Sequence, residues 1–269
     1  MAIVNTKSPV ITLTTDFGWR DNYAGIVRGV ITGLNPLARI IDISHASPVF
    51  NIEAGKYLIE TSYGNFPSGT IHVGIIDPTV GTKRKAILIE TEDYFFIGPD
   101  NGLFSFLATD SILRIISLTA GKYHLRPTSA TFHGRDIFAP VAGYLSLGVM
   151  PDEFGRKLPK LIRLKERRYT KRGGQLIGRI IYVDHFGNLV TSFRQTDLPE
   201  SRYSVYLNGH KIGALRETYD RAKKGRALCY INSFGYLEIA INWGSAADYF
   251  DINSDLSAKI LIAPVICNA

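Results

Sequence analysis

Residues 10–34 read VITLTTDFGWRDNYAGIVRGVITGL and combine a predicted strand with a predicted helix. Its first six residues form an apolar run typical of a buried strand. From Asp21 to Leu34, apolar residues recur at the spacing of one helix face, and Asn35-Pro36 ends that helix. A strand followed at once by a helix of this length is the repeating unit of α/β proteins.

The same alternation continues up to about residue 150. We expect further strands over 39–43 and 70–76, a helix over 51–60, a hairpin of 86–91 with 94–97, and an apolar helix over 136–147. Strands that alternate with helices in this way predict a largely parallel sheet, covered by helices on both faces.

A different pattern follows a basic run at residues 156–172. The rest of the chain has room for only one or two short helices, and turn signals such as Asn208-Gly separate its strand-like segments. The expected strands cover 175–183, 189–193, 203–207, 227–231, 236–241 and 259–262. This pattern predicts a small β-barrel or sandwich. We therefore expect an α/β domain over 1–160, a basic linker over 161–174 and an all-β domain over 175–269.

The basic charge of the chain is concentrated in one place. The 269 residues include 31 Lys and Arg against 24 Asp and Glu, a formal net charge of +7. Residues 156–172 hold nine basic residues and one Glu, or +8, so the remainder carries −1. A nucleic-acid site would interleave aromatic residues for base stacking, and this run contains only Tyr169. We therefore expect a solvated linker and no nucleic-acid partner.

Cysteine content and apolar runs exclude other classes. Two cysteines in 269 residues are too few for a disulfide scaffold or a Cys-rich zinc site. The longest uncharged apolar run, 137–150, is shorter than the ~20 residues that span a bilayer. No basic segment followed by an apolar stretch, as in a secretory signal, is visible at the start. We expect a soluble, cytoplasmic protein with no membrane partner.

Polar residues follow the predicted strands, at the edge where open α/β sheets bind ligands. Phosphate-loop, GxGxxG, GxSxG and HExxH motifs are all missing. Asp16 follows the first strand, and it could either cap the next helix or accept two hydrogen bonds from a ribose diol. Asp77 opens DPTVGTKR at 77–84 after the third strand, which is also compatible with an ordinary turn.

Three further segments carry polar residues of the same kind. TFHGRDIF at 131–138 places His133 before the apolar helix, where it is either structural or a general base or orienting group. In the β part, DHFGN at 184–188 and INSFGY at 231–236 place Asp and Asn beside glycine. Such sequences also form plain hairpin turns, so none of these segments is specific alone.

Taken together and in this order, the motifs resemble those of the S-adenosyl-L-methionine hydroxide adenosyltransferase family. This family is the hydrolytic branch of the superfamily that contains fluorinase and chlorinase. The resemblance covers nearly the whole chain and is carried by TTDFG (14–18), IDPTVGTKR (76–84), GPDNG (98–102), TFHGRDIFAP (131–140), DHFGN (184–188) and NSFGYLEIAINWGSA (232–246). It implies a Rossmann-like N-terminal domain, a C-terminal β-barrel and a homotrimer. Each site of the trimer would lie between one subunit's N-terminal domain and its neighbour's C-terminal domain.

The resemblance also implies S-adenosyl-L-methionine as substrate and assigns contacts to it. Asp16 would hold the ribose hydroxyls, while Phe50 would line the sugar and adenine pocket. Phe132 is assigned to substrate binding as well. Asp184 would bind the methionine ammonium group, and Asn188 would bind the adenine edge.

Ser233 and the backbone near it would bind the methionine carboxylate or the purine. Its neighbour Phe234, also assigned to substrate binding, stands where halogenating relatives have an arginine for that carboxylate. The carboxylate contact is therefore open. Fluorinase also carries an extra loop, for which residues 79–85 of this chain leave no room.

The hydrolytic branch is marked by a catalytic Asp-Arg-His trio, which corresponds here to Asp77, Arg84 and His133. Halogenating enzymes have tyrosines in place of Asp77 and His133, a hydroxyl residue at Val80 and a small hydroxyl residue at Gly134. The resemblance therefore implies that water or hydroxide attacks the ribose C5′ carbon, giving adenosine and L-methionine. Which member of the trio handles the proton stays open.

Two other functions are compatible with the same binding residues. One is a halide-dependent adenosyltransferase of the chlorinase or fluorinase type, but Asp77, Val80 and His133 argue against it. The other is a non-catalytic protein that binds adenosine or S-adenosyl-L-methionine. No metal or organic cofactor is implied, because the obvious carboxylate and imidazole groups already have roles.

Overall fold

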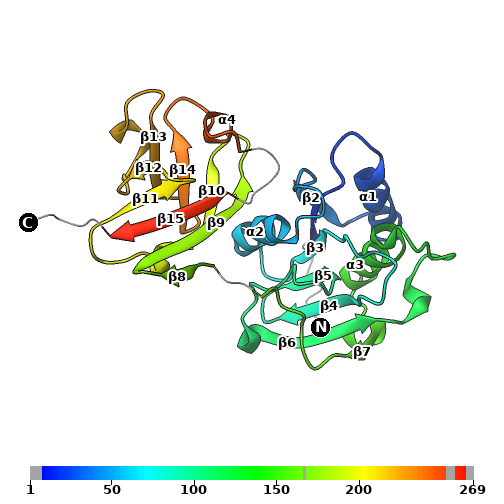
Figure 1. Cartoon of the computed structure of the whole chain (residues 1–269). Helices are drawn as coiled ribbons and strands as arrows, with labels where there is room; N and C mark the ends of the chain where they lie inside the picture. Colours follow the sequence, from blue (N-terminus) through cyan, green and yellow to red (C-terminus); the bar gives the residue numbers. More distant parts are fainter. Residues whose placement is uncertain (1–7, 166–167, 253–257, 265–269) are drawn as a thin grey trace, which may run out of the picture. The chain divides into compact units, whose positions relative to one another are not determined.

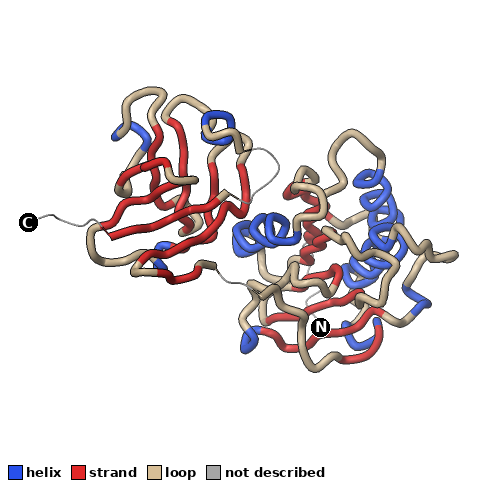
Figure 2. The backbone as a smooth tube through the Cα atoms, in the orientation of Figure 1, coloured by secondary structure: helices blue, strands red, loops and turns tan. Residues whose placement is uncertain are grey.

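A computed structural model describes residues 8–165, 168–252 and 258–264. The chain forms two compact units, the first ending at Leu164 and the second beginning at Lys165. Helices are concentrated in the first unit, and strands dominate the second (Figures 1 and 2).

The first unit is built on a seven-stranded mixed sheet. Its strands lie in the order β2 (Arg39–Ser44), β1 (Val10–Thr15), β3 (Ile71–Ile75), β5 (Phe95–Pro99), β4 (Ala86–Thr91), β6 (Ile112–Leu118) and β7 (Gly155–Lys157). Pairs from β2 to β5 are parallel, and pairs from β5 to β7 are antiparallel. The sheet is therefore mixed rather than mostly parallel. The predicted β4–β5 hairpin reverses the chain, and β6 and β7, which the sequence pattern does not reveal, continue the antiparallel order.

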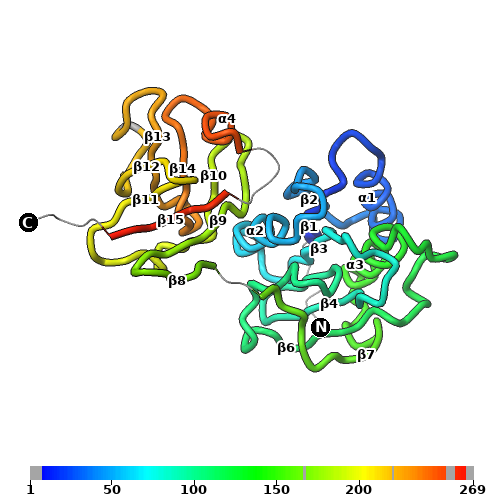
Figure 3. Tube along the Cα trace, viewed as in Figure 1, coloured from blue at the N-terminus to red at the C-terminus, as the bar shows by residue number. Residues whose placement is uncertain are grey.

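Helices cover both faces of this sheet (Figures 1 and 3). On one face, Val27 of α1 (Tyr23–Leu34) and Val141 of α3 (Ala139–Ser146) share an apolar cluster with Ile11 of β1. On the other, Ile59 of α2 (Ile52–Ser62) packs in a second cluster with Phe96. The three predicted helices are confirmed. No helix within the described residues is both long enough and apolar enough to cross a membrane.

The parallel half of the sheet brings two carboxylates to one edge. β1 and β3 are adjacent, with Thr15 opposite Ile75 at their carboxyl ends. Asp16 directly follows β1, and Asp77 lies two residues beyond β3. Because parallel strands end at the same edge of a sheet, both side chains start from neighbouring positions.

The second unit is a nearly closed antiparallel sheet. Its strands lie in the order β12 (His210–Gly213), β11 (Tyr203–Leu207), β15 (Lys259–Pro264), β9 (Gln175–Val183), β10 (Leu189–Arg194), β14 (Tyr236–Ile241) and β13 (Ala227–Ile231), with β8 (Thr170–Arg172) paired to β9. A bridge between Leu215 and Cys229 links the two ends around an apolar cluster that includes Phe193. The all-β prediction and its six strands are confirmed, and β8 and β12 add two more.

Most described residues of the basic segment 161–174 are exposed, and a few of its side chains contact the unit to which they belong. Leu161 is buried in the first unit, and the Arg163 guanidinium donates to two loop carbonyl oxygens at 2.9 and 2.8 Å. Residues 166 and 167 lie outside the described residues. In the second unit, Tyr169 stacks on Phe193 with 5.6 Å between ring centroids. The apolar and aromatic residues between the charges explain this packing.

Close approach of two strands generates a stability prediction. A Cβ atom at Gly98 of β5 would lie 2.3 Å from the carbonyl oxygen of Gly74 in β3. We expect Gly98→Ala to lower the free energy of unfolding by about 1–3 kcal/mol, as overpacking does. The matched control is Gly29→Ala in α1, where nothing lies within 4 Å. It should raise stability by up to about 1 kcal/mol through helix propensity. Urea unfolding of both variants tests this, and equal effects would contradict it.

Candidate functional site

A cavity of about 360 Å³ opens at the carboxyl edge of β1 and β3. Both carboxylates of that edge, Asp16 and Asp77, line it. The remaining lining residues are Phe17, Tyr23, Val49, Phe50, Ile75, Val80, Thr131, Phe132, His133 and Gly134. The cavity therefore combines an aromatic wall with a few charged and polar groups, which is typical of a small-molecule site.

Asp16 is fixed by the segment that follows β2. Its Oδ2 accepts a hydrogen bond from the backbone N–H of Phe50 at 2.8 Å. The residue that caps α1 is Asn22, and it makes no side-chain capping bond, so the capping interpretation of Asp16 is wrong. Burial raises the pKa of Asp16. The hydrogen bond from Phe50 lowers it, and the charge of Asp77 raises it again. A ligand that donates hydrogen bonds would stabilise the ionised form.

Phe50 adopts a backbone conformation that non-glycine residues rarely use, with φ of 61°. Its side chain is 67% exposed and forms part of the cavity wall. A left-handed non-glycine residue costs of order 1–3 kcal/mol and persists only when its surroundings enforce it. The hydrogen bond to Asp16 contributes to that enforcement and orients the Phe50 N–H toward the carboxylate.

Arg84 connects the other two members of the predicted trio. Its Nε donates to Asp77 Oδ2 at 2.8 Å, and its Nη2 donates to the same oxygen. Nη2 also lies 2.8 Å from Nδ1 of His133. The side chains of Arg84 and Asp77 are only 7% and 5% exposed. The structure thus brings His133 to Asp77 and Arg84, although it lies 49 residues beyond Arg84 in the sequence.

The contact with Arg84 defines the protonation of His133. A guanidinium has donors and no acceptor, so Nδ1 of His133 must accept, and the neutral ring carries its proton on Nε2. Burial lowers the pKa of His133 below 6.5, and the Arg84 cation lowers it further, while Asp77 and Asp136 oppose the shift. His133 is therefore a neutral imidazole that offers an N–H at Nε2.

A π turn, η4 (Gly134–Phe138), holds His133 at its start. Asp136 is 1% exposed and accepts hydrogen bonds from the Arg135 guanidinium and, at 2.7 Å, from the backbone N–H of Ser129. At Gly134, a Cβ atom would lie 3.3 Å from the ring of Phe132. The turn is therefore tied to the preceding loop and has little space for a larger residue beside the cavity.

Sequence reasoning missed a histidine that supports Asp16. His45 is fully buried, and its Nδ1 lies 2.8 Å from the hydroxyl of Thr15. Its Nε2 lies 3.1 Å from Asp42, which pairs with Arg28 at 2.5 Å. The backbone oxygen of His45 also accepts from Gly18 N–H at 2.6 Å. The only sequence signal was a histidine placed just after a predicted strand.

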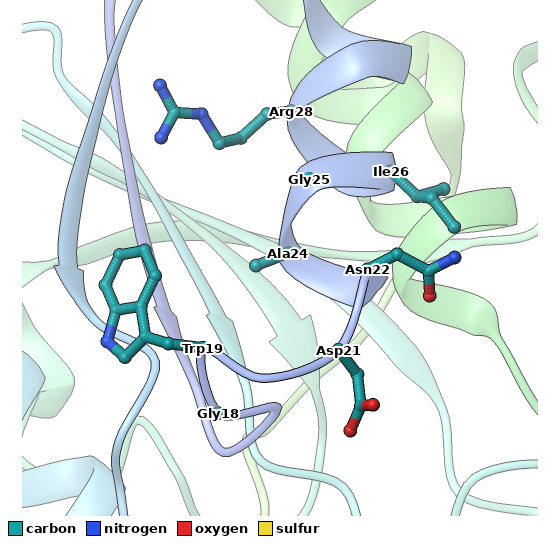
Figure 4. Close-up of a pocket in the computed structure, with 8 residues that line it drawn as sticks. All are labelled: Gly18, Trp19, Asp21, Asn22, Ala24, Gly25, Ile26 and Arg28. Carbon is teal, nitrogen blue, oxygen red and sulfur yellow. The ribbon is translucent and has the colours of Figure 1, made fainter.

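A second hollow, of about 540 Å³, lies over the start of α1 (Figure 4). Trp19 and Arg28 border it, together with Asp21 and Asn22 at the helix start. None of the residues predicted as site residues lines it. Of these two cavities, only the smaller one is lined by predicted site residues.

In the second unit, the predicted residues lie on two separate turns. Asp184 and Asn188 belong to the β9–β10 turn, where Asn188 Nδ2 donates to Asp184 Oδ2 at 2.9 Å. Ser233 and Phe234 belong to the β13–β14 turn. This turn lies beside the carboxyl end of β10, where the N–H of Gln195 donates to the carbonyl oxygen of Gly235 at 2.9 Å. The structure joins the first pair and does not place the second pair next to it.

Comparison with known proteins identifies the same two units. The SAM hydroxide adenosyltransferase N-terminal domain matches residues 11–155, and the corresponding C-terminal domain matches residues 178–257. A protein of Methanocaldococcus jannaschii named (R)-S-adenosyl-L-methionine hydrolase is 36% identical over 259 residues, covering 91% of this chain and 92% of that protein. The protein of the same name from Thermus thermophilus is 30% identical, covering 94% and 99%.

More distant similarity extends to halogenating enzymes and to solved structures. A fluorinase of an Actinoplanes species is 24% identical over 290 residues, covering 94% of this chain and 97% of the fluorinase. The crystal structure of an uncharacterized conserved protein from Thermotoga maritima superposes with a TM-score of 0.83 at 31% identity, covering 94% of this chain and 99% of that protein.

The geometry of the trio predicts how His133 titrates. We expect its imidazole pKa, followed by NMR, to lie below 6.5, because burial and Arg84 disfavour the cation. In the Asp77→Asn variant the pKa should fall further, since the anion that partly offsets Arg84 is removed. Asp110→Asn, an exposed substitution outside the cavity, should leave it unchanged. A pKa of 6.5 or above in the unmodified protein would contradict this account.

Proposed function

The chain belongs to the SAM hydroxide adenosyltransferase family, and we propose that it hydrolyses S-adenosyl-L-methionine to adenosine and L-methionine. The oxygen of water forms a bond to ribose C5′ while the C5′–S bond breaks. The electron pair of that bond goes to the sulfonium sulfur, which leaves as the neutral thioether of methionine. The attacking water loses one proton, so the site must favour hydroxide character.

One observation carries this proposal: the Arg84 guanidinium is bonded to both Asp77 and His133 beside a cavity that also holds Asp16. A buried cation stabilises negative charge on an attacking oxygen, and a dry site strengthens that interaction. Free water has a pKa of about 15.7, so electrostatic assistance of this kind is needed for attack near neutral pH.

The hydrogen bonds suggest how the trio divides its work. His133 already gives its Nδ1 lone pair to Arg84, so it can donate from Nε2 and hold a water molecule in place. Asp77 Oδ2 is occupied by Arg84, while Oδ1 accepts a 3.3 Å hydrogen bond from Thr79. We assign proton acceptance to the Asp77 carboxylate, with Arg84 stabilising charge and His133 orienting the nucleophile.

The substrate contacts follow the same proposal. Asp16 would accept hydrogen bonds from the ribose hydroxyls, beside the aromatic walls of Phe50 and Phe132. Asn188 would contact the adenine edge. Asp184 Oδ2 accepts from Asn188 and keeps a lone pair for the methionine ammonium group.

Ser233 and Phe234 are proposed contacts of the methionine carboxylate or the purine. We also propose a Rossmann-like description of the parallel strands β2–β1–β3, because helices α1 and α2 connect them in turn. Among the described residues, no group of three or more His, Cys, Asp or Glu side chains is placed to hold a metal ion.

Halide transfer is less well supported than hydrolysis. Val80 lines the cavity with an apolar side chain, and Gly134 offers no hydroxyl group to a halide. Four proteins named (R)-S-adenosyl-L-methionine hydrolase are 30–36% identical to this chain, against 23–24% for the fluorinases. Chromatography of reactions with and without chloride or fluoride distinguishes the two: a halogenated nucleoside would favour halide transfer, and no product would favour a binding protein.

Loss of the Asp77 carboxylate tests the proposed chemistry. We expect Asp77→Asn to lower kcat by about 10²-fold or more, the scale of losing acid–base catalysis, because its amide cannot accept the proton. Adenosine affinity, measured by calorimetry, should change little, since Asp16 and the aromatic walls are retained.

The matched control is Asp110→Asn, which makes the same substitution on the surface outside the cavity. Its turnover should equal that of the unmodified protein. Unchanged kcat in Asp77→Asn would remove Asp77 from the mechanism. A parallel loss in Asp110→Asn would show that the assay reports stability rather than catalysis.

We further propose a homotrimer whose sites combine residues of two subunits. Asp77→Asn and Asn188→Ala should each abolish most activity as pure trimers. Trimers refolded from an equal mixture of the two variants should regain activity at about one site in four. At such a site, one subunit supplies an intact Asp77 and its neighbour supplies an intact Asn188. Activity of the mixture no higher than the mean of the two variants would show that each site belongs to one subunit.

A further inference from the structure

A buried hydrogen-bonded chain crosses the outer side of β13 and β14 in the second unit. Glu238 lies in the middle of β14 and is 5% exposed. Tyr230, its direct partner across the strand pair, is 9% exposed. Tyr230 packs against a segment that includes Tyr219 and Ala222. A carboxylate buried on a sheet is costly, so its partners define what it does.

The chain connects Glu238 to the predicted adenine contact. The Tyr230 hydroxyl donates to Glu238 Oε1, and the hydroxyls of Tyr219 and Tyr230 are hydrogen bonded. Asn188 Nδ2 lies 3.3 Å from the Tyr219 hydroxyl. The path therefore runs from the side chain of Asn188 through two tyrosines to one carboxylate.

The direction of these bonds is set at Glu238. An ionised carboxylate only accepts, so Tyr230 must donate to it and accept from Tyr219, and Tyr219 in turn must accept from Asn188. The second amide hydrogen of Asn188 goes to Asp184 Oδ2 at 2.9 Å. Both N–H groups of Asn188 are then used, and its Oδ1 stays as an acceptor.

Glu238 also fixes the β13–β14 turn. Its Oε2 accepts from Asn232 Nδ2 at 2.8 Å. The Oδ1 of Asn232 accepts from the backbone N–H groups of Phe234 and Tyr236, both at 3.0 Å. Burial raises the pKa of Glu238 overall, and the charge of Asp184 adds to this rise. The hydrogen bonds that Tyr230 and Asn232 donate oppose it and stabilise the carboxylate form.

We infer that Glu238 is a positioning residue that acts through Tyr230 and Tyr219 to hold the Asn188 amide with its carbonyl oxygen toward the base. This inference rests on the proposed function. An acceptor at this position hydrogen bonds to the 6-amino group of adenine and faces the 6-oxo group of hypoxanthine unfavourably. The network therefore determines specificity for 6-aminopurine over 6-oxopurine nucleosides.

Calorimetric binding of adenosine and inosine tests the inference without requiring turnover. We expect the unmodified protein to prefer adenosine by about tenfold or more, because an unmatched polar group is strongly disfavoured in a buried site. Tyr230→Phe keeps the ring and breaks the path, so this preference should fall severalfold; Asp184 Oδ2 still accepts from Asn188 and retains the rest of it. Tyr219→Phe, on the half-exposed segment, should give the same loss and guards against misfolding of the first variant.

The matched control is Thr191→Val, which removes another buried hydroxyl of the same sheet, bonded to the carbonyl oxygen of Leu237 at 2.8 Å. It should keep the adenosine-to-inosine ratio. If the network is purely structural, the tyrosine variants will bind both nucleosides more weakly by the same factor, which would overturn the inference. Equal affinities of the unmodified protein for adenosine and inosine would also overturn it. Adenosine preference without hydrolysis of S-adenosyl-L-methionine would refute the proposed function alone.

Discussion

The pairing of one buried guanidinium with a carboxylate and an imidazole is the constraint on which the first unit's cavity depends. Arg84 and Asp77 are both almost fully buried, and a buried charge is tolerated only when it is paired and hydrogen bonded. Loss of either partner would leave the other uncompensated. The turn after β3 must therefore return Arg84 to the end of that strand, and the π turn η4 must present Nδ1 of His133 to the same guanidinium. The position of all three groups, and with it the chemistry, follows from this requirement.

Rigid elements bring these groups to one place. β1 and β3 deliver Asp16 and Asp77 to a shared edge, and the hydrogen bond from Phe50 holds the Asp16 carboxylate. The segment around Asp16 is also supported by the contacts of buried His45 with Thr15 and Asp42. The second unit uses a different device, a chain of tyrosines ending on Glu238, to orient Asn188. In both units, a polar side chain that would contact substrate is held by a hydrogen bond to another segment rather than by its own turn alone.

Periodicity and turn signals were sufficient for the elements with strong local patterns. They predicted β1 and α1, the β4–β5 hairpin and six strands of the second unit, because apolar spacing and glycine turns are local properties. They did not reveal β6 and β7, whose antiparallel pairing depends on distant strands, so the sheet is mixed. The charge pattern of the basic run did not indicate that Leu161 is buried or that Tyr169 stacks on Phe193. The trio was grouped by family resemblance; its hydrogen bonds, the tautomer of His133 and the support from His45 depend on tertiary contacts that no local pattern encodes.

The central claim is that water, activated beside Arg84, attacks ribose C5′. The most direct test is mass spectrometry of the products formed from S-adenosyl-L-methionine in H₂¹⁸O, with chloride present. Attack at C5′ places the new oxygen in the 5′-hydroxyl group, so the account predicts one ¹⁸O atom in adenosine and none in methionine. A halogenated nucleoside, or adenosine without the ¹⁸O label, would contradict it.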